Sequence, residues 1–238
     1  MEIKEAIILA GGLGTRLRSA VPELPKCMAP VDGRPFLSYV VNYYRQQGIS
    51  KFIFSLGYRH EAVTSWLKEN YPDLTMEFSI EREPLGTGGA VQLAMGKVKE
   101  QDVLILNGDT FFEISLEELK KVHQQNSSAC SICLKPMQDF DRYGIVETDD
   151  DGRIMDFKEK QQYAEGLING GVYLLNSPRF RQQQRPVVFS FEKDYLERSY
   201  YAMPMYGVVQ KGYFIDIGIP EDYTRAQAEL PALVPAEK

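Results

Sequence analysis

Two periodicities of apolar and polar residues divide the first half of the chain into short alternating segments. Apolar runs with the length of buried strands lie at 6–10, 51–56, 76–80 and 101–107. Between them, apolar residues recur with the period of one helix face around 37–44 and 62–69, and Ser115 with Glu118 has the spacing of a helix start. Strands separated by helices of this length predict an α/β fold with a doubly wound, mostly parallel sheet.

The second half is less regular and richer in strands. Strand-like runs with few helices between them occupy 129–134, 144–148, 153–158, 167–174 and 203–209. We expect them to extend the sheet and to add a smaller antiparallel lobe, which forms one wall of a cleft. A final helix is predicted over 220–230, because proline suits the first helical position. No repeat or low-complexity linker divides the sequence, so we expect a single domain over 1–238, with halves of about 1–126 and 127–230.

Composition and charge place the chain among ordinary globular proteins. Of its 238 residues, 44% are hydrophobic and 25% are charged, and no apolar run approaches the ~18 residues of a membrane helix. The start, MEIKEAII, carries two glutamates and lacks the pattern of a secretory signal, so we expect a cytoplasmic protein without a membrane partner. The formal net charge of −6 argues against a nucleic-acid partner, because proteins that bind polyanions present a basic face.

The three cysteines are not expected to form a disulfide framework. Cys27 stands alone, and Cys130 and Cys133 form a C-x-x-C pattern within a strand-like run. Residues three apart on a strand point to opposite faces. Two buried or half-buried thiols are therefore favoured over a metal or redox pair.

A glycine-rich stretch follows the first strand. Gly11, Gly12 and Gly14 let backbone N–H groups approach an anion, because no Cβ blocks the way. Arg16 adds a planar fork of donors for phosphate oxygens, and Lys26 adds a mobile positive charge. The stretch therefore predicts a phosphate site.

Two better-known phosphate loops do not fit this stretch. The dinucleotide pattern G-x-G-x-x-G would need a glycine where Leu17 stands. A P-loop would need Gly-Lys-Ser/Thr, whereas Gly14 is followed by Thr15 and Arg16. The remaining alternative is an ordinary glycine-rich turn with a surface arginine and lysine.

Two aspartates predict a site for a divalent cation. Asp109, in Asn107-Gly108-Asp109, follows the most apolar strand of the chain, and open α/β sheets bind ligands outside the carboxyl ends of their strands. Asp216 follows another short strand and is the natural second ligand. Hard carboxylate oxygens suit Mg²⁺, which also takes water and phosphate oxygens. The alternative for Asp109 is a turn aspartate that caps the next segment.

A further glycine-rich segment, residues 83–90, is expected to approach a flat ligand just before a helix. Gly86, Gly88 and Gly89 leave the backbone open, and the Glu83 carboxylate only accepts hydrogen bonds. Guanine offers N1–H and N2–H₂ donors on one edge, whereas uracil and thymine offer one N–H between acceptors. The segment therefore favours GTP, and an ordinary loop leading into a helix is the alternative.

Three short segments of the second half carry groups that suit a sugar phosphate. Gly144 permits close approach, and Glu159 and Asn169 can pair with sugar hydroxyls. Lys160 can neutralise a phosphate. Taken singly, each of these is more often a solvated surface group.

The stretch from Leu9 to Leu17, with Pro25 and Lys26 behind it, resembles the signature of the sugar-1-phosphate nucleotidyltransferases. The other segments described above occur in the same order, and carry the same types of residue, as the binding segments of this family. The resemblance implies a Rossmann-like catalytic domain that binds Mg²⁺, a nucleoside triphosphate and a sugar 1-phosphate, and releases pyrophosphate. EPLGTGGA and LNGDTFFEI most resemble the D-glycero-α-D-manno-heptose-1-phosphate guanylyltransferases, followed by the mannose-1-phosphate guanylyltransferases.

The implied reaction needs no activated side chain, because a sugar phosphate oxygen is already an anionic nucleophile. We expect in-line attack on the α-phosphorus, with Arg16 on the departing pyrophosphate, Lys26 near the α-phosphate and Lys160 on the attacking phosphate. The expected residues are Arg16, Lys26 and Asp109 for catalysis; Leu9, Gly11, Gly12, Gly14, Thr15, Glu83, Gly88 and Asn107 for the nucleotide; Gly144, Glu159, Lys160 and Asn169 for the sugar phosphate; and Asp109 and Asp216 for Mg²⁺.

Alternatives remain for the substrate, the function and the assembly. Mannose or another sugar 1-phosphate could replace the heptose, because one added carbon in a pocket changes binding by only ~1–3 kcal/mol. A catalytically silent sensor of nucleotide sugars is the alternative from another class. Tyr195, Tyr200 and Tyr201 are candidates for a subunit contact in a homo-oligomer.

Overall fold

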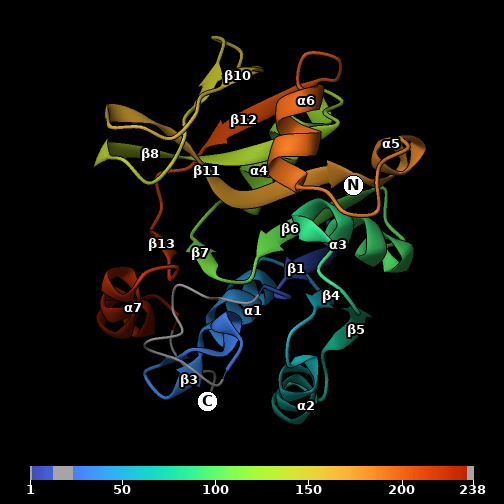
Figure 1. The fold of residues 1–238 in the computed structure, drawn as a ribbon, viewed down its shortest axis with the longest axis vertical. Helices are drawn as coiled ribbons and strands as arrows, with labels where there is room; N and C mark the ends of the chain where they lie inside the picture. The colour runs from blue at the N-terminus through green and yellow to red at the C-terminus, as the bar shows by residue number, and fades with distance from the viewer. Residues whose placement is uncertain (1, 13–23, 235–238) are drawn as a thin grey trace.

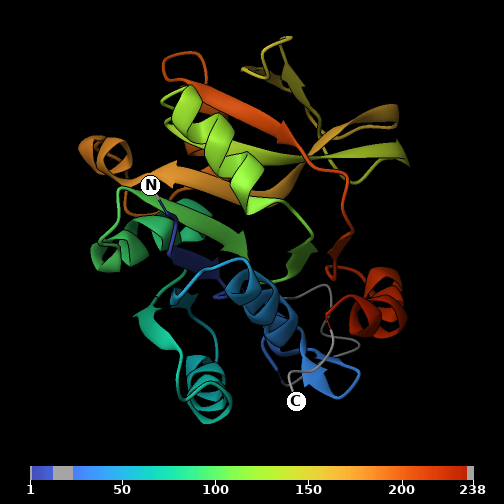
Figure 2. The same cartoon turned by 180° about the vertical axis from the view of Figure 1, so that it is seen from behind.

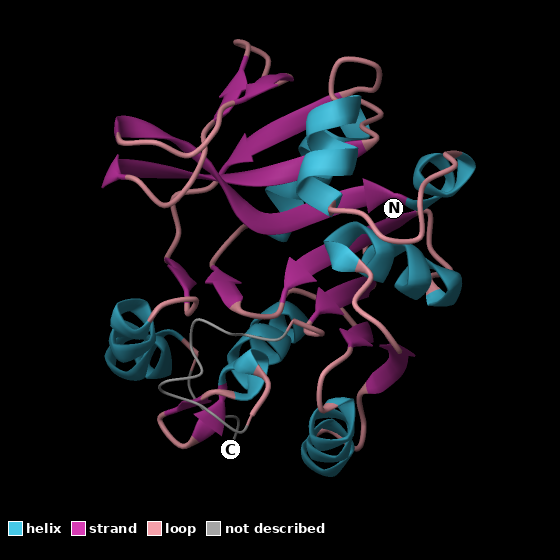
Figure 3. Cartoon of the chain, in the orientation of Figure 1, coloured by secondary structure: helices cyan, strands magenta, loops and turns pink. Residues whose placement is uncertain are grey.

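A seven-stranded sheet crosses the molecule in the computed structural model, which describes residues 2–12 and 24–234 (Figure 1). In order across the sheet, its strands are β12 (Met205–Val209), β8 (Cys130–Phe140), β11 (Tyr163–Asn176), β6 (Asp102–Asn107), β1 (Glu5–Leu9), β4 (Lys51–Leu56) and β5 (Thr75–Ile80). Figure 3 shows these strands in magenta and the helices that cover them in cyan.

The sheet strands of the first half run parallel, and their order reverses at β1. β4 and β5 follow on one side of β1, and β6 returns to its other side. The predicted strands of this half are confirmed to within one residue at each end. A doubly wound sheet binds ligands where its strand order reverses, outside the carboxyl ends of the strands. That point lies between Leu9 and Asn107, which pair at the ends of β1 and β6.

The second half extends the same sheet, as expected. β11 lies antiparallel to both β6 and β8, and β12 lies parallel to β8, so the whole sheet is mixed. Three short antiparallel pairs lie outside it: β9 (Val146–Thr148) with β10 (Ile154–Phe157), β7 (Thr110–Phe112) with β13 (Phe214–Asp216), and β2 (Pro30–Val31) with β3 (Arg34–Pro35). The predicted α/β fold with a mostly parallel, mixed sheet is confirmed.

Helices cover both faces of the sheet, as the front and back views show (Figures 1 and 2). One core contains buried residues of α1 (Phe36–Gln46), α2 (His60–Asn70), α4 (Leu116–Gln125) and α7 (Pro220–Leu233). The core on the other face contains residues of α3 (Gly86–Ala94), the 3₁₀ turn η3 (Met95–Lys97), α5 (Ser177–Gln182) and the π-helix η4 (Phe191–Leu196). The remaining short elements are η2 (Lys26–Met28) and α6 (Glu197–Ser199).

Successive side chains of a buried strand point to opposite faces of the sheet and lie in different cores. In β1, Ala6 and Ile8 lie in the core with α1, whereas Ile7 lies in the core with α3. Cys130 and Cys133 are also divided between the cores, and both thiols are free and buried. The strand period therefore separates the two cysteines, as predicted.

The surface differs from expectation at one tyrosine. Tyr195 is fully buried and packs against the rings of Phe180 and Phe191, which rules it out as a surface contact. Tyr200 is half-buried, and Tyr201 is 72% exposed. Within residues 2–12 and 24–234, no helix has the length and apolar character needed to cross a bilayer.

Candidate active site

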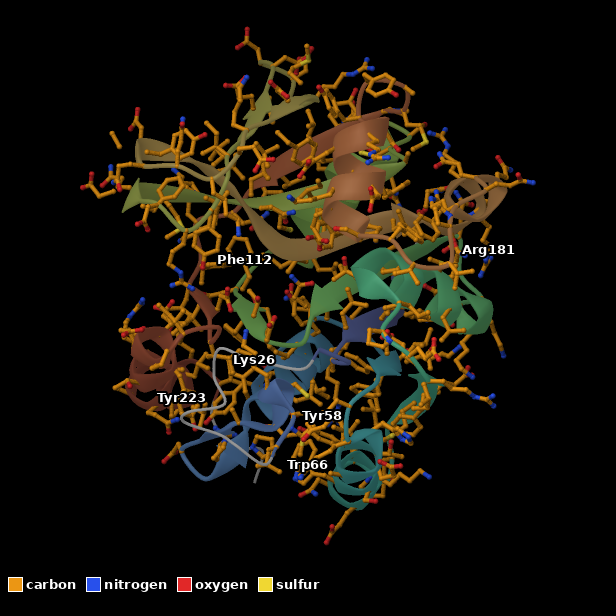
Figure 4. All side chains as sticks on the ribbon, in the orientation of Figure 1. Lys26, Tyr58, Trp66, Phe112, Arg181 and Tyr223 are labelled. Carbon is orange, nitrogen blue, oxygen red and sulfur yellow. The ribbon has the colours of Figure 1, made fainter. Side chains whose placement is uncertain are left out.

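A cavity of about 1010 Å³ opens where β1, β4, β5 and β6 end. The predicted site residues in its lining are Leu9, Gly11, Gly12, Lys26, Glu83, Asn107 and Asp109. In Figure 4, Lys26 lies near the middle of the molecule, between the labelled side chains of Phe112 and Tyr58. The reversal point of the sheet therefore gathers most of the residues predicted for the nucleotide and for catalysis. Gly14, Thr15 and Arg16 lie outside the described residues.

Pairing of β7 with β13 brings the two predicted metal ligands together. Asp216 lies opposite Thr110, the neighbour of Asp109. The Lys26 ammonium lies between the two carboxylates, 2.5 Å from Asp109 Oδ2 and 3.2 Å from Asp216 Oδ1. Only 10% of the Lys26 side chain is exposed, whereas 40% of Asp109 is. Both aspartates therefore direct an oxygen at one cation.

Few other metal ligands stand near this pair. Across residues 2–12 and 24–234, no cluster of three or more histidine, cysteine, aspartate or glutamate side chains could hold a metal ion. Cys27 lines the cavity, but burial and the Asp109 carboxylate raise the pKa of its thiol to about 12. Cys27 is therefore a neutral thiol, and the two aspartates are the acidic groups that converge.

Arg142, which the sequence did not single out, contacts the outer side of this pair. Its guanidinium lies 3.8 Å from Asp216 Oδ2 and forms a closer ion pair with Asp222, in the first turn of α7. Burial alone would lower the pKa of Arg142, but the Asp222 and Asp216 carboxylates raise it. Gly218 N donates to Asp216 Oδ1 at 2.8 Å. Asp216 is thus held by Lys26, Arg142 and a backbone N–H.

The backbone approaches itself closely on the floor of the cavity. Gly108 N donates to Leu9 O at 2.9 Å, and a Cβ at Gly108 would lie 2.8 Å from the same oxygen. A Cβ at Gly11 would lie 2.8 Å from Glu81 Oε1. At Gly108 the obstacle is backbone, so the contact between the ends of β1 and β6 depends on glycine there, whereas at Gly11 it is the end of a flexible side chain.

Glu81 is a second residue that the sequence analysis missed. It follows β5, lines the cavity, and accepts a hydrogen bond from Leu85 N at 3.0 Å. Burial raises the pKa of its carboxyl group. Residues 57–60, which follow β4, also line the cavity. Their position in the sequence could have identified them, because Glu81 and residues 57–60 each come directly after a predicted parallel strand.

Helix α3 begins earlier than predicted. Gly86, Gly88 and Gly89 were expected in a loop before a helix, but α3 starts at Gly86, so they form its first turn. A Cβ at Gly88 would lie 2.2 Å from the ring of Phe189. Gly88 therefore packs α3 against the segment before η4, and it is not among the described residues that line the cavity. The lining residues of this turn are Gly86 and Thr87.

Gly171 from the second half packs against Asn107 from the first, and Asn169 is hydrogen-bonded to Gly171. β11 is irregular between Asn169 and Tyr173, and Gly171 takes a φ of +72° there. Asn169 Oδ1 accepts a hydrogen bond from Gly171 N at 3.0 Å, and a Cβ at Gly171 would lie 2.7 Å from Asn107 Nδ2. The irregularity therefore connects Asn169, predicted for the sugar, with Asn107, predicted for the nucleotide, through Gly171.

None of the residues predicted for the sugar phosphate, Asn169 included, is among the described residues that line the cavity. Glu159 and Lys160 are exposed on the segment that follows β10. Gly144 packs against the backbone, where a Cβ would lie 2.1 Å from Lys158 O. None of the three is among the described residues of the lining.

Two relatives match this chain over nearly the whole of both sequences, and a third matches it over part of its own length. The D-glycero-alpha-D-manno-heptose 1-phosphate guanylyltransferase of Aneurinibacillus thermoaerophilus is 48% identical, over 95% of this chain and 98% of its own. The protein of the same name from Campylobacter jejuni is 43% identical, over 92% of this chain and 96% of its own. Mannose-1-phosphate guanylyltransferase 1 of Arabidopsis thaliana is more distant, with 31% identity over 92% of this chain and 62% of its own.

A solved structure and a family model agree with these relatives. The crystal structure of HddC from Yersinia pseudotuberculosis complexed with GMP-PN superposes with a TM-score of 0.83 and 35% identity, over 94% of this chain and 98% of its own. Residues 5–232 match the family model described as nucleotidyl transferase. The match spans both halves of the sheet and includes Lys26, Asp109 and Asp216. This chain belongs to the nucleotidyl transferase family.

Proposed function

We propose that this chain transfers the guanylyl group of GTP to D-glycero-α-D-manno-heptose 1-phosphate, giving GDP-heptose and pyrophosphate. The observation that carries the proposal is the Lys26 ammonium between Asp109 and Asp216, in a cavity that the glycines after β1 also line. Two relatives named for this activity, 48% and 43% identical over nearly their whole lengths, support the choice of base and sugar.

The groups of this site suit a reaction between two polyanions. A sugar phosphate oxygen is already nucleophilic, so the main barrier is the repulsion between phosphates. Lys26 and the backbone N–H groups near Gly11 and Gly12 supply positive potential within a molecule whose net charge is −6. We infer in-line attack on the α-phosphorus, with the Lys26 ammonium donating to the α-phosphate.

Asp109 and Asp216 are the residues that would hold Mg²⁺. Their oxygens already converge on one cation, and hard carboxylate oxygens fit this ion. When bound, Mg²⁺ would neutralise phosphate charge and orient the phosphates for displacement. Arg142 and Gly218 N would keep Asp216 oriented, since both contact its carboxylate.

Two carboxylates are candidates for the contact with guanine. Glu83 is exposed and Glu81 is half-buried, and both line the cavity. An ionised carboxylate accepts hydrogen bonds and donates none, so it matches the N1–H and N2–H₂ edge of guanine. This match supports GTP over UTP and TTP.

The remaining assignments stay predictions. Arg16 is assigned to the departing pyrophosphate and Lys160 to the attacking phosphate. Glu159, Asn169 and Gly144 are assigned to the sugar. Among them, Asn169 is supported by its hydrogen bond with Gly171, which packs against Asn107 at the end of β6.

Pyrophosphate release tests the proposed function. The purified chain is incubated with Mg²⁺ and each nucleoside triphosphate, in turn with heptose 1-phosphate, mannose 1-phosphate and glucose 1-phosphate. We expect release with GTP and heptose 1-phosphate, and kcat/KM roughly 10- to 200-fold lower with mannose 1-phosphate. If kcat/KM is higher with mannose 1-phosphate, the proposed sugar substrate is wrong and mannose 1-phosphate takes its place. No release with any pair, with nucleotide sugar still bound, would favour the sensor.

A further inference from the structure

Lys26 has contacts that its role at the α-phosphate does not require. Its ammonium contacts one oxygen of Asp109 and one of Asp216, and these two oxygens are the ones that converge. A divalent cation held by the same two oxygens would stand where the ammonium stands, and two cations repel strongly at contact. The arrangement seen here and the metal-bound arrangement therefore exclude each other.

We propose that Lys26 is an exchangeable counter-ion, which holds the two aspartates together and leaves them when nucleotide and metal bind together. The inference rests on the proposed metal ligands Asp109 and Asp216. In the free protein, the ammonium offsets the repulsion between two carboxylates that share a site. In the loaded protein, the phosphates of the nucleotide become its new partner.

The surroundings allow the ammonium to move while the carboxylates stay. Asp216 keeps two other partners, the guanidinium of Arg142 and the N–H of Gly218, so it does not depend on Lys26 for its orientation. Gly218 leaves one side of the ammonium open, since a Cβ there would lie 3.2 Å from Lys26 Nζ. Lys26 and Gly218 both line the cavity, and a lysine stem is flexible.

The exchange makes metal and nucleotide binding interdependent. Without nucleotide, a free divalent cation must displace an ammonium that has no other anionic partner among its described contacts. With nucleotide, the phosphates receive that ammonium, and the metal meets less opposition. Such coupling is reciprocal, so metal strengthens nucleotide binding by the same factor.

Binding of Mn²⁺ in the absence of nucleotide gives the sharpest test, because a catalytic lysine that only contacts phosphate would not compete there. Free Mn²⁺ is followed by its electron paramagnetic resonance signal in the wild type, in Lys26→Met and in Arg82→Gln. We expect Lys26→Met to bind Mn²⁺ roughly tenfold tighter than the wild type, within the range of coupled sites. Arg82→Gln removes the same charge from the same cavity and should change the affinity less than about twofold.

A second arm uses α,β-methylene GTP, whose bridging carbon prevents transfer. With this analogue present, we expect the order to reverse, so that Lys26→Met binds Mn²⁺ more weakly than the wild type. Equal or weaker Mn²⁺ binding by Lys26→Met in both arms would overturn the proposal and make Lys26 a fixed structural partner. If Arg82→Gln increases the Mn²⁺ affinity as much as Lys26→Met does, the effect comes from the net charge of the cavity and the proposal is overturned.

The wild type supplies a test that needs no variant. Lysine acetylation by a soluble reagent is mapped by mass spectrometry with and without Mg²⁺. We expect Mg²⁺ to increase modification of the nearly buried Lys26 several-fold and to leave the exposed Lys121 unchanged. Unchanged modification of Lys26 at a Mg²⁺ concentration that saturates the site would contradict the exchange. Neither assay needs the sugar substrate, so their outcome is separate from that of the pyrophosphate assay.

Discussion

Asp109 is the residue at which the proposed chemistry is easiest to measure. Its carboxylate contacts Lys26, and 40% of its side chain remains exposed at the cavity. Asp109→Asn removes one charge without changing the volume of the side chain. We expect kcat to fall about a hundred- to a thousandfold, the cost of one electrostatic contact in the transition state. Pyrophosphate release under saturating GTP and sugar 1-phosphate measures this loss.

The matched control for this substitution is Asp150→Asn, in the exposed turn between β9 and β10. This variant makes the same chemical change away from the cavity and should retain the wild-type rate. Thermal unfolding of both variants should stay near that of the wild type, which separates lost chemistry from lost folding. Near-normal turnover of Asp109→Asn would remove the metal assignment.

Sequence and structure agree on single residues where a residue follows a recognisable strand or motif. Lys26, Asp109 and Asp216 could be predicted in this way, and the structure brings them into contact. Arg142 could not, because its partners lie on β13 and α7, and only tertiary pairing reveals them. Glu81 escaped notice because its burial against the Gly11 turn has no sequence pattern.

At the scale of elements, the packing of α3 against the segment before η4 depends on glycines, and Gly88 is the one that faces a ring. Gly88 N donates to Phe189 O at 3.0 Å, and the Phe189 ring occupies the space in which a Gly88 side chain would lie. Gly88→Ala should destabilise the fold by about 1–3 kcal/mol, the cost of overpacking a filled core. For a chain of this length, calorimetry should record a fall in Tm of roughly 2–4 °C for each kcal/mol.

Gly96 provides the control for that prediction. It lies in η3, and a Cβ added there meets no atom within 4 Å. Gly96→Ala should therefore leave Tm unchanged or raise it slightly, since alanine restricts the unfolded chain. If both substitutions lower Tm equally, the effect comes from the backbone and the contact with Phe189 is not its cause.

Element boundaries were predictable where one face is buried and the period is complete. β4 matches its apolar run at both ends, and the Ser115 side chain accepts from Glu118 N as the predicted start of α4. The start of α3 was missed because glycines argue against a helix, whereas here they are needed for close packing. β8 and β11 extend further than predicted, because their outer ends are largely polar and show no strand period.

At the scale of the whole molecule, the site results from the order of strands. Parallel pairing of β1 with β6 puts the glycine-rich turn beside Asn107, and antiparallel pairing of β7 with β13 adds Asp216. The alternation of strands and helices predicted the doubly wound sheet. It could not predict which segments of the second half approach the first, because that depends on the bulge before Tyr173 and on the path to β13.

The amino end of the sheet, opposite the cavity, is held by a buried ion network. Glu5 is 4% exposed, and its carboxylate contacts the Lys51 ammonium at 2.9 Å. It also accepts from the backbone N–H groups of Lys99 and Glu100 at 2.7 and 2.9 Å. Lys51 in turn contacts Glu77, so the network ties β1, β4, β5 and the approach to β6 into one unit.

This network makes the stability of the whole fold depend on pH. Burial would raise the pKa of Glu5, but Lys51 and the two N–H donors lower it below its ordinary value of 4.5. A carboxylate with a lowered pKa contributes stability above 4.5 and loses it as the pH falls through the folded-state pKa. Glu5→Gln should therefore cost about 1–3 kcal/mol in urea unfolding at pH 7. The gap to the wild type should shrink below pH 4.5.

The surface pair of Glu2 with Lys4 separates this effect from a general change in charge. The two side chains are 2.9 Å apart but largely exposed, so Glu2→Gln should leave the free energy of unfolding at pH 7 close to that of the wild type. The difference in free energy of unfolding from the wild type should depend strongly on pH only for Glu5→Gln. In the folded state, the Glu5 carboxylate is buried and bound by several donors, whereas that of Glu2 is in water. A gap of constant size from pH 7 to pH 4 would mean that Glu5 acts by shape and hydrogen bonding alone, with no contribution from its charge.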